Sequence, residues 1–209
     1  MESASIAAHN HHVDDHHHGP PEAHQSARID RTVLGILLFI LSEIMLFGAF
    51  FAAYFFLRVV ADPASWPPEG IELPVLIAGI NTAVLISSSF TVHYALEAIK
   101  HNNHRGLKLG LTLTWLLGAT FLFIQINEYI HIGFTPRDGA FGSIFFSLTG
   151  LHGAHVFVGL LLLTFANIRA YRGHFGPEQK DHLGVEVPGI YWHFVDIMWI
   201  IVFLAIYIV

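Results

Sequence analysis

The stretch RTVLGILLFILSEIMLFGAFFAAYFFLR, residues 31–58, decides the fold of this chain. Between the flanking Arg31 and Arg58 every residue is apolar or uncharged except Glu43. At ~1.5 Å rise per residue, the segment 32–57 spans roughly 39 Å, more than the ~30 Å hydrocarbon core of a bilayer. The stretch therefore predicts a tilted transmembrane helix that carries one carboxyl group near its middle.

The composition of the whole chain agrees with a membrane protein. Of its 209 residues, 54% are hydrophobic and 12% are charged, whereas soluble domains average about 25% charged residues. The absence of cysteine from the sequence excludes disulfides, thiolate chemistry and iron–sulfur clusters. The ten lysines and arginines are scattered near segment ends rather than gathered on one face, so no nucleic-acid partner is expected.

Four more apolar segments follow the first one. We expect five transmembrane helices at about residues 32–57, 73–96, 109–127, 143–168 and 188–209. The connecting loops are too short to hold a second domain. The predicted fold is therefore an all-α, polytopic membrane helical bundle that occupies residues 28–209.

The first 27 residues have a different composition, rich in histidine with Asp, Gly and Pro. Histidine clusters bind Zn²⁺, Cu²⁺ or Ni²⁺, so the segment could bind metal. Alternatively, the segment does not bind metal as part of its function. Such a composition cannot form a hydrophobic core, and we expect a disordered tail at residues 1–27. The candidate metal ligands are His9, His11, His12, His16, His17 and His18, followed by His24.

The distribution of cations predicts the orientation. The tail and the second and fourth loops lie on one side and hold eight of the ten lysines and arginines; the other side holds Arg58 and Arg137. Cytoplasmic loops carry the excess of positive charge. The N-terminus is therefore expected in the cytoplasm and the C-terminus outside.

Glu43 needs a polar partner, because a carboxylate at the centre of a transmembrane helix costs about 2.5–3.5 kcal/mol on insertion scales. His152 and His155 lie at a similar depth in segment 143–168 and are three residues apart. We hypothesise a hydrogen bond from Glu43 to one of them. Four small residues would let the two helices approach closely, namely Gly150, Gly153, Ala154 and Gly159.

Other interpretations of the histidine pair stay open. Two histidines at this spacing can bind a metal or haem, but no other segment supplies a matching cluster at this depth beyond Glu43. The remaining choices are a structural hydrogen bond and a role linked to protons or lipid. In the last segment His193 and Asp196 have the same spacing, and an acid there must face protein. We expect Asp196 to be paired internally, with His193 as a candidate.

A catalytic role for the isolated chain finds little support. A rhomboid-type protease needs its serine in a Gly-x-Ser setting, and Ser87 to Ser89 lie in ISSSF. We therefore expect no catalytic residue here. A small transporter is harder to exclude, although carriers usually show internal repeats and broken helices, and no repeat is evident in this sequence.

Four stretches in chain order carry a family pattern. They are LSEIMLFGAFFAAYFF (41–56), WPPEGIELPVLIAGINTAVLISSS (66–89), QINEYIHIGFTPRDGAFGSIFFSLTGLHGAHVFVG (125–159) and YWHFVDIMW (191–199). Together they resemble subunit III of haem–copper respiratory oxidases, in its five-helix bacterial form. The match runs from about Val33 to the C-terminus, with Phe141 where the family usually has tyrosine.

The resemblance implies a function for the chain. It would be a non-catalytic subunit of a proton-pumping terminal oxidase that reduces O₂ to water, in the bacterial inner (plasma) membrane. It would hold no redox centre; haem and copper would lie in partner subunits, with subunit I as the main contact and subunit II as a second one. Alternatives are the accessory protein of a nitric oxide reductase and a small transporter. The electron donor, cytochrome c or quinol, stays open.

The resemblance also implies a site for structural phospholipid. Longer members hold lipid phosphates with a run R-x-x-K-x-H-F, and here Arg169, Arg172 and His174 occupy its polar positions. Arginine can bind phosphate through two nitrogens, so it can replace the family's lysine. Ordinary anchoring of cations at the cytoplasmic interface would place the same charges here.

Overall fold

The computed structural model describes residues 30–61, 66–68, 70–175 and 182–208. These residues form five long helices: α1 (Arg31–Val60), α2 (Val75–Lys100), α3 (His104–His131), α4 (Gly139–Tyr171) and α5 (Leu183–Phe203). A π-helical turn, Leu204–Ile208, continues α5. All five are long and apolar enough to cross a membrane, which confirms the predicted all-α, five-helix fold. The histidine-rich residues 1–27 lie outside the described part of the chain.

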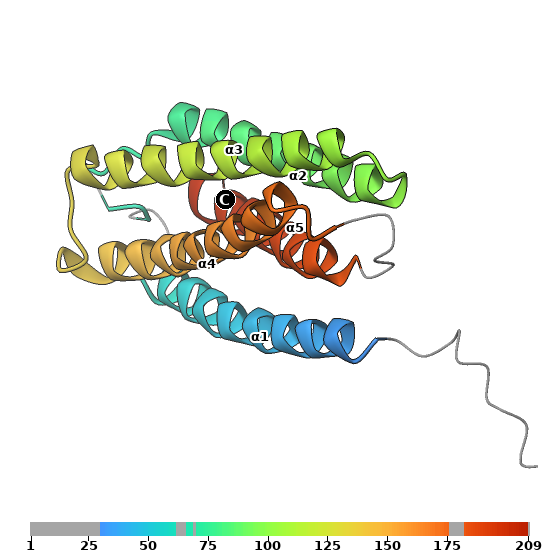
Figure 1. Cartoon of the computed structure of the whole chain (residues 1–209). Coiled ribbons are helices and arrows are strands. Elements are labelled where there is room, and N and C mark those ends of the chain that lie inside the picture. The colour runs from blue at the N-terminus through green and yellow to red at the C-terminus, as the bar shows by residue number, and fades with distance from the viewer. Residues whose placement is uncertain (1–29, 62–65, 69, 176–181, 209) are drawn as a thin grey trace, which may run out of the picture. The chain divides into compact units, whose positions relative to one another are not determined.

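The helices of residues 31–208 pack around α5 (Figure 1). Helices α2 and α3 lie side by side, and α5 lies between this pair and α1, in contact with α2, α4 and α1. Helix α1 packs chiefly against α4 and α5. It buries only Phe47 and Tyr54, whereas α5 buries eleven residues. The first helix is thus the most weakly embedded element of the bundle.

The core contains one unusually close contact between an aromatic ring and two glycines. The Trp192 indole of α5 lies against Gly118 of α3 and Gly159 of α4. A Cβ atom at Gly159 would lie 2.9 Å from Cε3 and Cζ3 of that indole, closer than real Cβ contacts. These glycines therefore make room for a ring that no larger residue would admit.

The expectation that small residues of α4 bring α1 close is wrong for its glycines. A Cβ at Gly150 would be nearest Tyr129, and one at Gly153 would be nearest Leu122, both residues of α3. Gly159 faces Trp192 instead. The spacing of small residues identifies helices that can approach closely, but it does not say which neighbour a given face meets.

The observed helices extend beyond the predicted segments at one or both ends. Hydropathy locates the part of a helix inside the hydrocarbon, whereas the backbone stays helical into the interface until it is capped. At α3, for example, the Asn103 side chain caps the helix by accepting a 3.0 Å hydrogen bond from the Gly106 N–H. Helix α5 begins at Leu183 rather than at Pro188, because transmembrane helices tolerate proline when neighbours compensate for the lost hydrogen bond.

Candidate functional site

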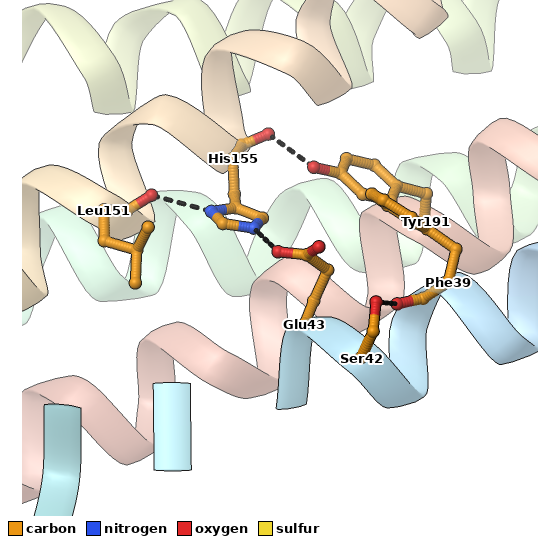
Figure 2. A network of polar contacts seen from close by, with 6 residues as sticks. All are labelled: Phe39, Ser42, Glu43, Leu151, His155 and Tyr191. Carbon is orange, nitrogen blue, oxygen red and sulfur yellow. Dashed lines mark hydrogen bonds and ion pairs between the residues drawn. The ribbon is translucent and has the colours of Figure 1, made fainter. Parts of the chain in front are cut away.

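A hydrogen bond between α1 and α4 joins two ionisable side chains inside the bundle. His155 Nε2 lies 2.8 Å from Glu43 Oε2 (Figure 2). Both side chains are largely buried, with 10% of His155 and 17% of Glu43 exposed. The pair holds α1, which buries so little else, against the remaining helices. The interaction is favoured in the low dielectric of the site, where polar groups have no competing water.

The other ring nitrogen of His155 determines how many protons the pair holds. His155 Nδ1 lies 2.7 Å from the Leu151 carbonyl oxygen, which can only accept, so Nδ1 carries hydrogen and donates (Figure 2). A single proton then lies between Nε2 and the Glu43 carboxyl: either the acid donates to a neutral ring or the imidazolium donates to a carboxylate. In both cases the pair as a whole is neutral.

Aromatic residues surround this pair and fix the ring of His155. The Phe47 ring centroid lies 5.0 Å from that of His155, and the Phe194 centroid lies 6.3 Å from it. The Tyr191 hydroxyl donates to the His155 carbonyl oxygen at 3.4 Å (Figure 2). The pair is therefore held in one orientation by packing from α1 and α5, rather than by the bond alone.

His152 does not reach Glu43. It is fully buried between Phe121 and Trp199, with ring centroids 5.7 and 4.7 Å away. Neither of its ring nitrogens has a hydrogen-bond partner among the described residues. Positions three apart on a helix differ by about 60° in direction. That difference turns His155 toward α1 and His152 toward α3 and α5, so the predicted single network with both histidines is divided.

Asp196 and His193 meet through a third residue, Ser89 of α2. The Ser89 hydroxyl donates to Asp196 Oδ2 and lies 3.3 Å from His193 Nδ1. Asp196 is 4% exposed, and its Oδ1 has no partner within the described part of the chain. No described hydrogen bond links this group to Glu43 and His155. The five predicted network residues thus lie in three places, and the described partner of Asp196 is Ser89 rather than the candidate His193.

A second buried acid, Glu128, is missing from the sequence-based candidates. It is 6% exposed and accepts a 2.7 Å hydrogen bond from the Tyr207 hydroxyl. Its Oε2 and both amide atoms of the neighbouring Gln125 have no partner among the described residues. Hydropathy alone places Glu128 at the end of segment 109–127, where an acid would be interfacial. The sequence feature that could have indicated a buried partner for Glu128 is Tyr207, which places a hydroxyl group in an otherwise apolar C-terminal segment.

The three predicted lipid-binding residues lie at the C-terminal end of α4 and have exposed side chains. The Arg169 guanidinium lies over the Phe175 ring, 5.1 Å from its centroid. Arg172 instead lines a groove with Thr112 and Tyr171. No described contact joins the side chains of Arg169, Arg172 and His174, although the His174 N–H donates to the Arg169 carbonyl at 3.0 Å.

The described residues contain no group of three or more His, Asp or Glu side chains placed to hold a metal ion. The candidate ligands His9, His11, His12, His16, His17 and His18 lie outside those residues. The hydrogen bonds described above define the candidate functional site as the neutral pair of Glu43 and His155, together with the group of Ser89, His193 and Asp196.

Comparison with known proteins matches this chain to the family "Cytochrome c oxidase subunit III" over residues 7–209. It is 43% identical to cytochrome c oxidase subunit 3 of Thermostichus vulcanus, covering 93% of this chain and 91% of that protein. Identity to the subunit of Synechocystis sp. is 40%, with 92% and 78% covered. For Drosophila melanogaster it is 41%, with 83% and 67% covered.

These matches confirm the resemblance drawn from the four sequence stretches. They extend the similarity over almost the whole length of the chain, including all five helices. They support neither a nitric oxide reductase accessory protein nor a small transporter. The chain belongs to the cytochrome c oxidase subunit III family.

Proposed function

We propose that this chain serves as subunit III of a proton-pumping terminal oxidase that reduces O₂ to water, where it stabilises the catalytic subunit and holds lipid against it. The observation that carries the proposal is the family match over residues 7–209. As a family member the chain is a multi-pass, non-catalytic component of a respiratory oxidase complex. Haem and copper are proposed to lie in the partner subunits.

Polar side chains on the membrane-exposed surface support docking to a partner subunit. Ser87 and His93 of α2 are exposed, and His193 of α5 is partly exposed, within helices long enough to span the bilayer. Polar groups at membrane depth usually face protein rather than lipid. We therefore assign the α2 and α5 face to the contact with subunit I, and a smaller contact to subunit II.

The stabilising role rests on the Glu43 and His155 pair. It joins α1 to α4 across a contact in which α1 buries only Phe47 and Tyr54. Without the pair the attachment of α1 to α4 would be weaker, and the hydrogen bond from the Tyr54 hydroxyl to the Ala205 carbonyl oxygen, 2.8 Å long, would remain to join α1 to the end of the last helix. The pair is thus proposed as a structural element, and no electron or substrate passes through it.

Lipid binding and orientation complete the proposal. Arg169, Arg172 and His174 are exposed at one end of α4 and can bind phosphate of structural phospholipid. That end lies on the side that holds eight of the ten lysines and arginines, which favours the cytoplasmic side of the bacterial inner membrane. The N-terminus would then be cytoplasmic and the C-terminus outside.

Gentle detergent purification through this chain, followed by an optical spectrum and metal analysis, tests the function. Stoichiometric haem with copper is the expected result. Haem with non-haem iron would indicate a reductase accessory protein, and a colourless folded chain would indicate a transporter. A variant that lacks residues 1–27 is the control, because the histidines there could add adventitious metal.

A further inference from the structure

Six buried polar atoms on helices α2, α3 and α4 have no hydrogen-bond partner within the described part of the chain. They are Oδ1 of Asn81, Nε2 and Oε1 of Gln125, Oε2 of Glu128 and both ring nitrogens of His152. Each of these four side chains is at most 6% exposed. The large majority of buried side-chain polar atoms in proteins are hydrogen-bonded, either to protein or to ordered water. These atoms therefore require partners that the helices themselves do not supply.

The four side chains lie along one line that starts at Phe121 of α3. The Asn81 amide donates to the Phe121 carbonyl oxygen at 3.2 Å, and the His152 ring centroid lies 5.7 Å from that of Phe121. Gln125 follows Phe121 by four residues and Glu128 follows Gln125 by three, so the three share one face of α3. At ~1.5 Å rise per residue, Phe121 and Glu128 are roughly 10 Å apart along the helix. The six atoms thus form a row inside the bundle rather than scattered single sites.

Glu128 connects this row to the surface of the protein. It lines a pocket of about 210 Å³ together with residues that include Asn127 and His131, which are exposed. The pocket lies where α2 begins and α3 ends, opposite the end of the bundle that holds most of the cations. The Tyr207 hydroxyl donates to Glu128 Oε1 at 2.7 Å, and the Gln125 amide lies near the same hydroxyl without hydrogen-bond geometry. The Glu128 carboxyl therefore stands at the boundary between the pocket and the buried row.

The chemistry of the row selects a ligand that both donates and accepts hydrogen bonds. Gln125 Nε2 and one nitrogen of a neutral His152 ring are donors, whereas Asn81 Oδ1 and Gln125 Oε1 are acceptors. A metal ion would serve the acceptors alone, and the described residues hold no group of three side chains placed to bind one. An anion would serve the donors alone. Water serves both, and a buried water typically makes about three hydrogen bonds to such groups.

We propose that the interior of α2 to α5 binds a row of water molecules that enters at Glu128 and ends at His152. Six polar atoms at about three hydrogen bonds per water correspond to on the order of two or three waters. The row brings water and exchangeable protons from one side of the membrane to His152, near the middle of α4. It ends there because the Phe121 and Trp199 rings pack against the His152 ring, and both nitrogens of the next histidine, His155, are already used.

An inlet that ends near the middle of the membrane does not let protons leak across it. The row is separate from the pair of Glu43 and His155, because no described hydrogen bond joins the two. It is built only from residues of this chain, so it does not depend on which partner subunits surround the chain. The open end lies on the side that the charge distribution assigns to the outside.

Radiolytic footprinting of the purified complex in ¹⁸O-labelled water tests the row. Short X-ray pulses turn water into hydroxyl radicals, which add to aromatic rings beside that water, and mass spectrometry reads the added oxygen at each residue. Phe121 and Phe47 are matched reporters, since both rings are 0% exposed. Phe121 contacts His152, whose nitrogens have no described partner, whereas Phe47 contacts His155, whose nitrogens are both paired. Phe121 should take up several-fold more ¹⁸O than Phe47, and equal uptake would overturn the proposal.

A pair of variants on α3 tests whether the unpaired atoms hold the water. Gln125→Leu removes two of those atoms at nearly constant volume and should lower the labelling of Phe121 several-fold. Thr114→Val is the control, because its buried hydroxyl is already paired with the Thr91 hydroxyl and the Gly110 carbonyl. This control should leave the labelling of Phe121 unchanged. Retention of the chain in the complex shows that each variant is folded, and an equal change in both variants would contradict the proposal.

Rapid mixing with ¹⁸O-labelled water before the X-ray pulse locates the open end. Asn127→Trp places a ring in the pocket beside Glu128 and should slow the appearance of ¹⁸O in Phe121 several-fold. His104→Trp fills a pocket at the other end of the bundle and should leave that rate unchanged. The reverse pattern, or equal rates in both variants, would overturn entry at Glu128. The label is read on this chain itself, so a complex without haem and copper would reject the proposed function while leaving this test decisive.

Discussion

At the scale of single residues, the hydrogen bonds of His155 determine how its ring pairs with Glu43. Its Nδ1 donates to a backbone carbonyl and its Nε2 meets a carboxyl group, so both nitrogens are used. A glutamine at position 43 could donate an amide N–H to the same Nε2, whereas alanine could donate nothing. Hydrogen bonding and proton sharing can therefore be separated by the choice of substitution.

Glu43→Ala should weaken the attachment of α1 by about 1–3 kcal/mol, because it leaves His155 Nε2 buried without a partner. Glu43→Gln should retain most of that stability. The measurement is the temperature at which the chain dissociates from the complex, followed on native gels, with the haem spectrum recorded alongside. Ser42→Ala is the control, since its exposed hydroxyl donates only to the Phe39 carbonyl. Loss of haem in Glu43→Ala would contradict a structural role.

Ser89→Ala should destabilise the bundle by about 1–3 kcal/mol, because Asp196 would lose its donor while remaining buried. Ser147→Ala of α4 is the control, because its exposed hydroxyl donates only to the Ser143 carbonyl. Thermal unfolding followed by circular dichroism gives the difference. Equal effects of the two substitutions would show that Asp196 does not depend on Ser89.

At the level of helices, the packing of α5 depends on two glycines that face the Trp192 ring. Gly159→Ala should destabilise the bundle by about 1–3 kcal/mol, since overpacking forces the indole or the α4 backbone to shift. Gly150→Ala is the control, because its Cβ would lie 4.0 Å from the nearest neighbouring side-chain atom, Tyr129 Oη, in ordinary contact. The two are compared by thermal unfolding of the purified complex, and equal stability would mean that the ring has room to move.

The helices were predictable because transmembrane segments are apolar over their whole length, and Glu43 and His155 were recognisable because polar groups are rare there. Which of two neighbouring histidines meets Glu43 was not predictable. It depends on where α1 lies around α4, and no local pattern contains that information. The sequence could not distinguish Ser89 from the two serines beside it as the partner of Asp196. Glu128 was not identified as buried because the apolar segment ends at residue 127, whereas helix α3 continues to His131.

For the whole molecule, the charge asymmetry predicts which end of the bundle faces the cytoplasm. The sequence contains no cysteine, so a single introduced thiol reports one position only. Arg105 near the start of α3 and Arg137 before α4 are exposed at opposite ends of the bundle. Arg105→Cys and Arg137→Cys are therefore matched probes of the two sides.

A membrane-impermeant maleimide should label Arg137→Cys in intact spheroplasts and Arg105→Cys only after the membrane is inverted or opened. The reason is that loops with excess lysine and arginine stay on the cytoplasmic side, whereas the loop with Arg137 has few cations. Both variants should react fully in detergent, which confirms that the thiols are accessible. The reverse pattern would place the N-terminus outside.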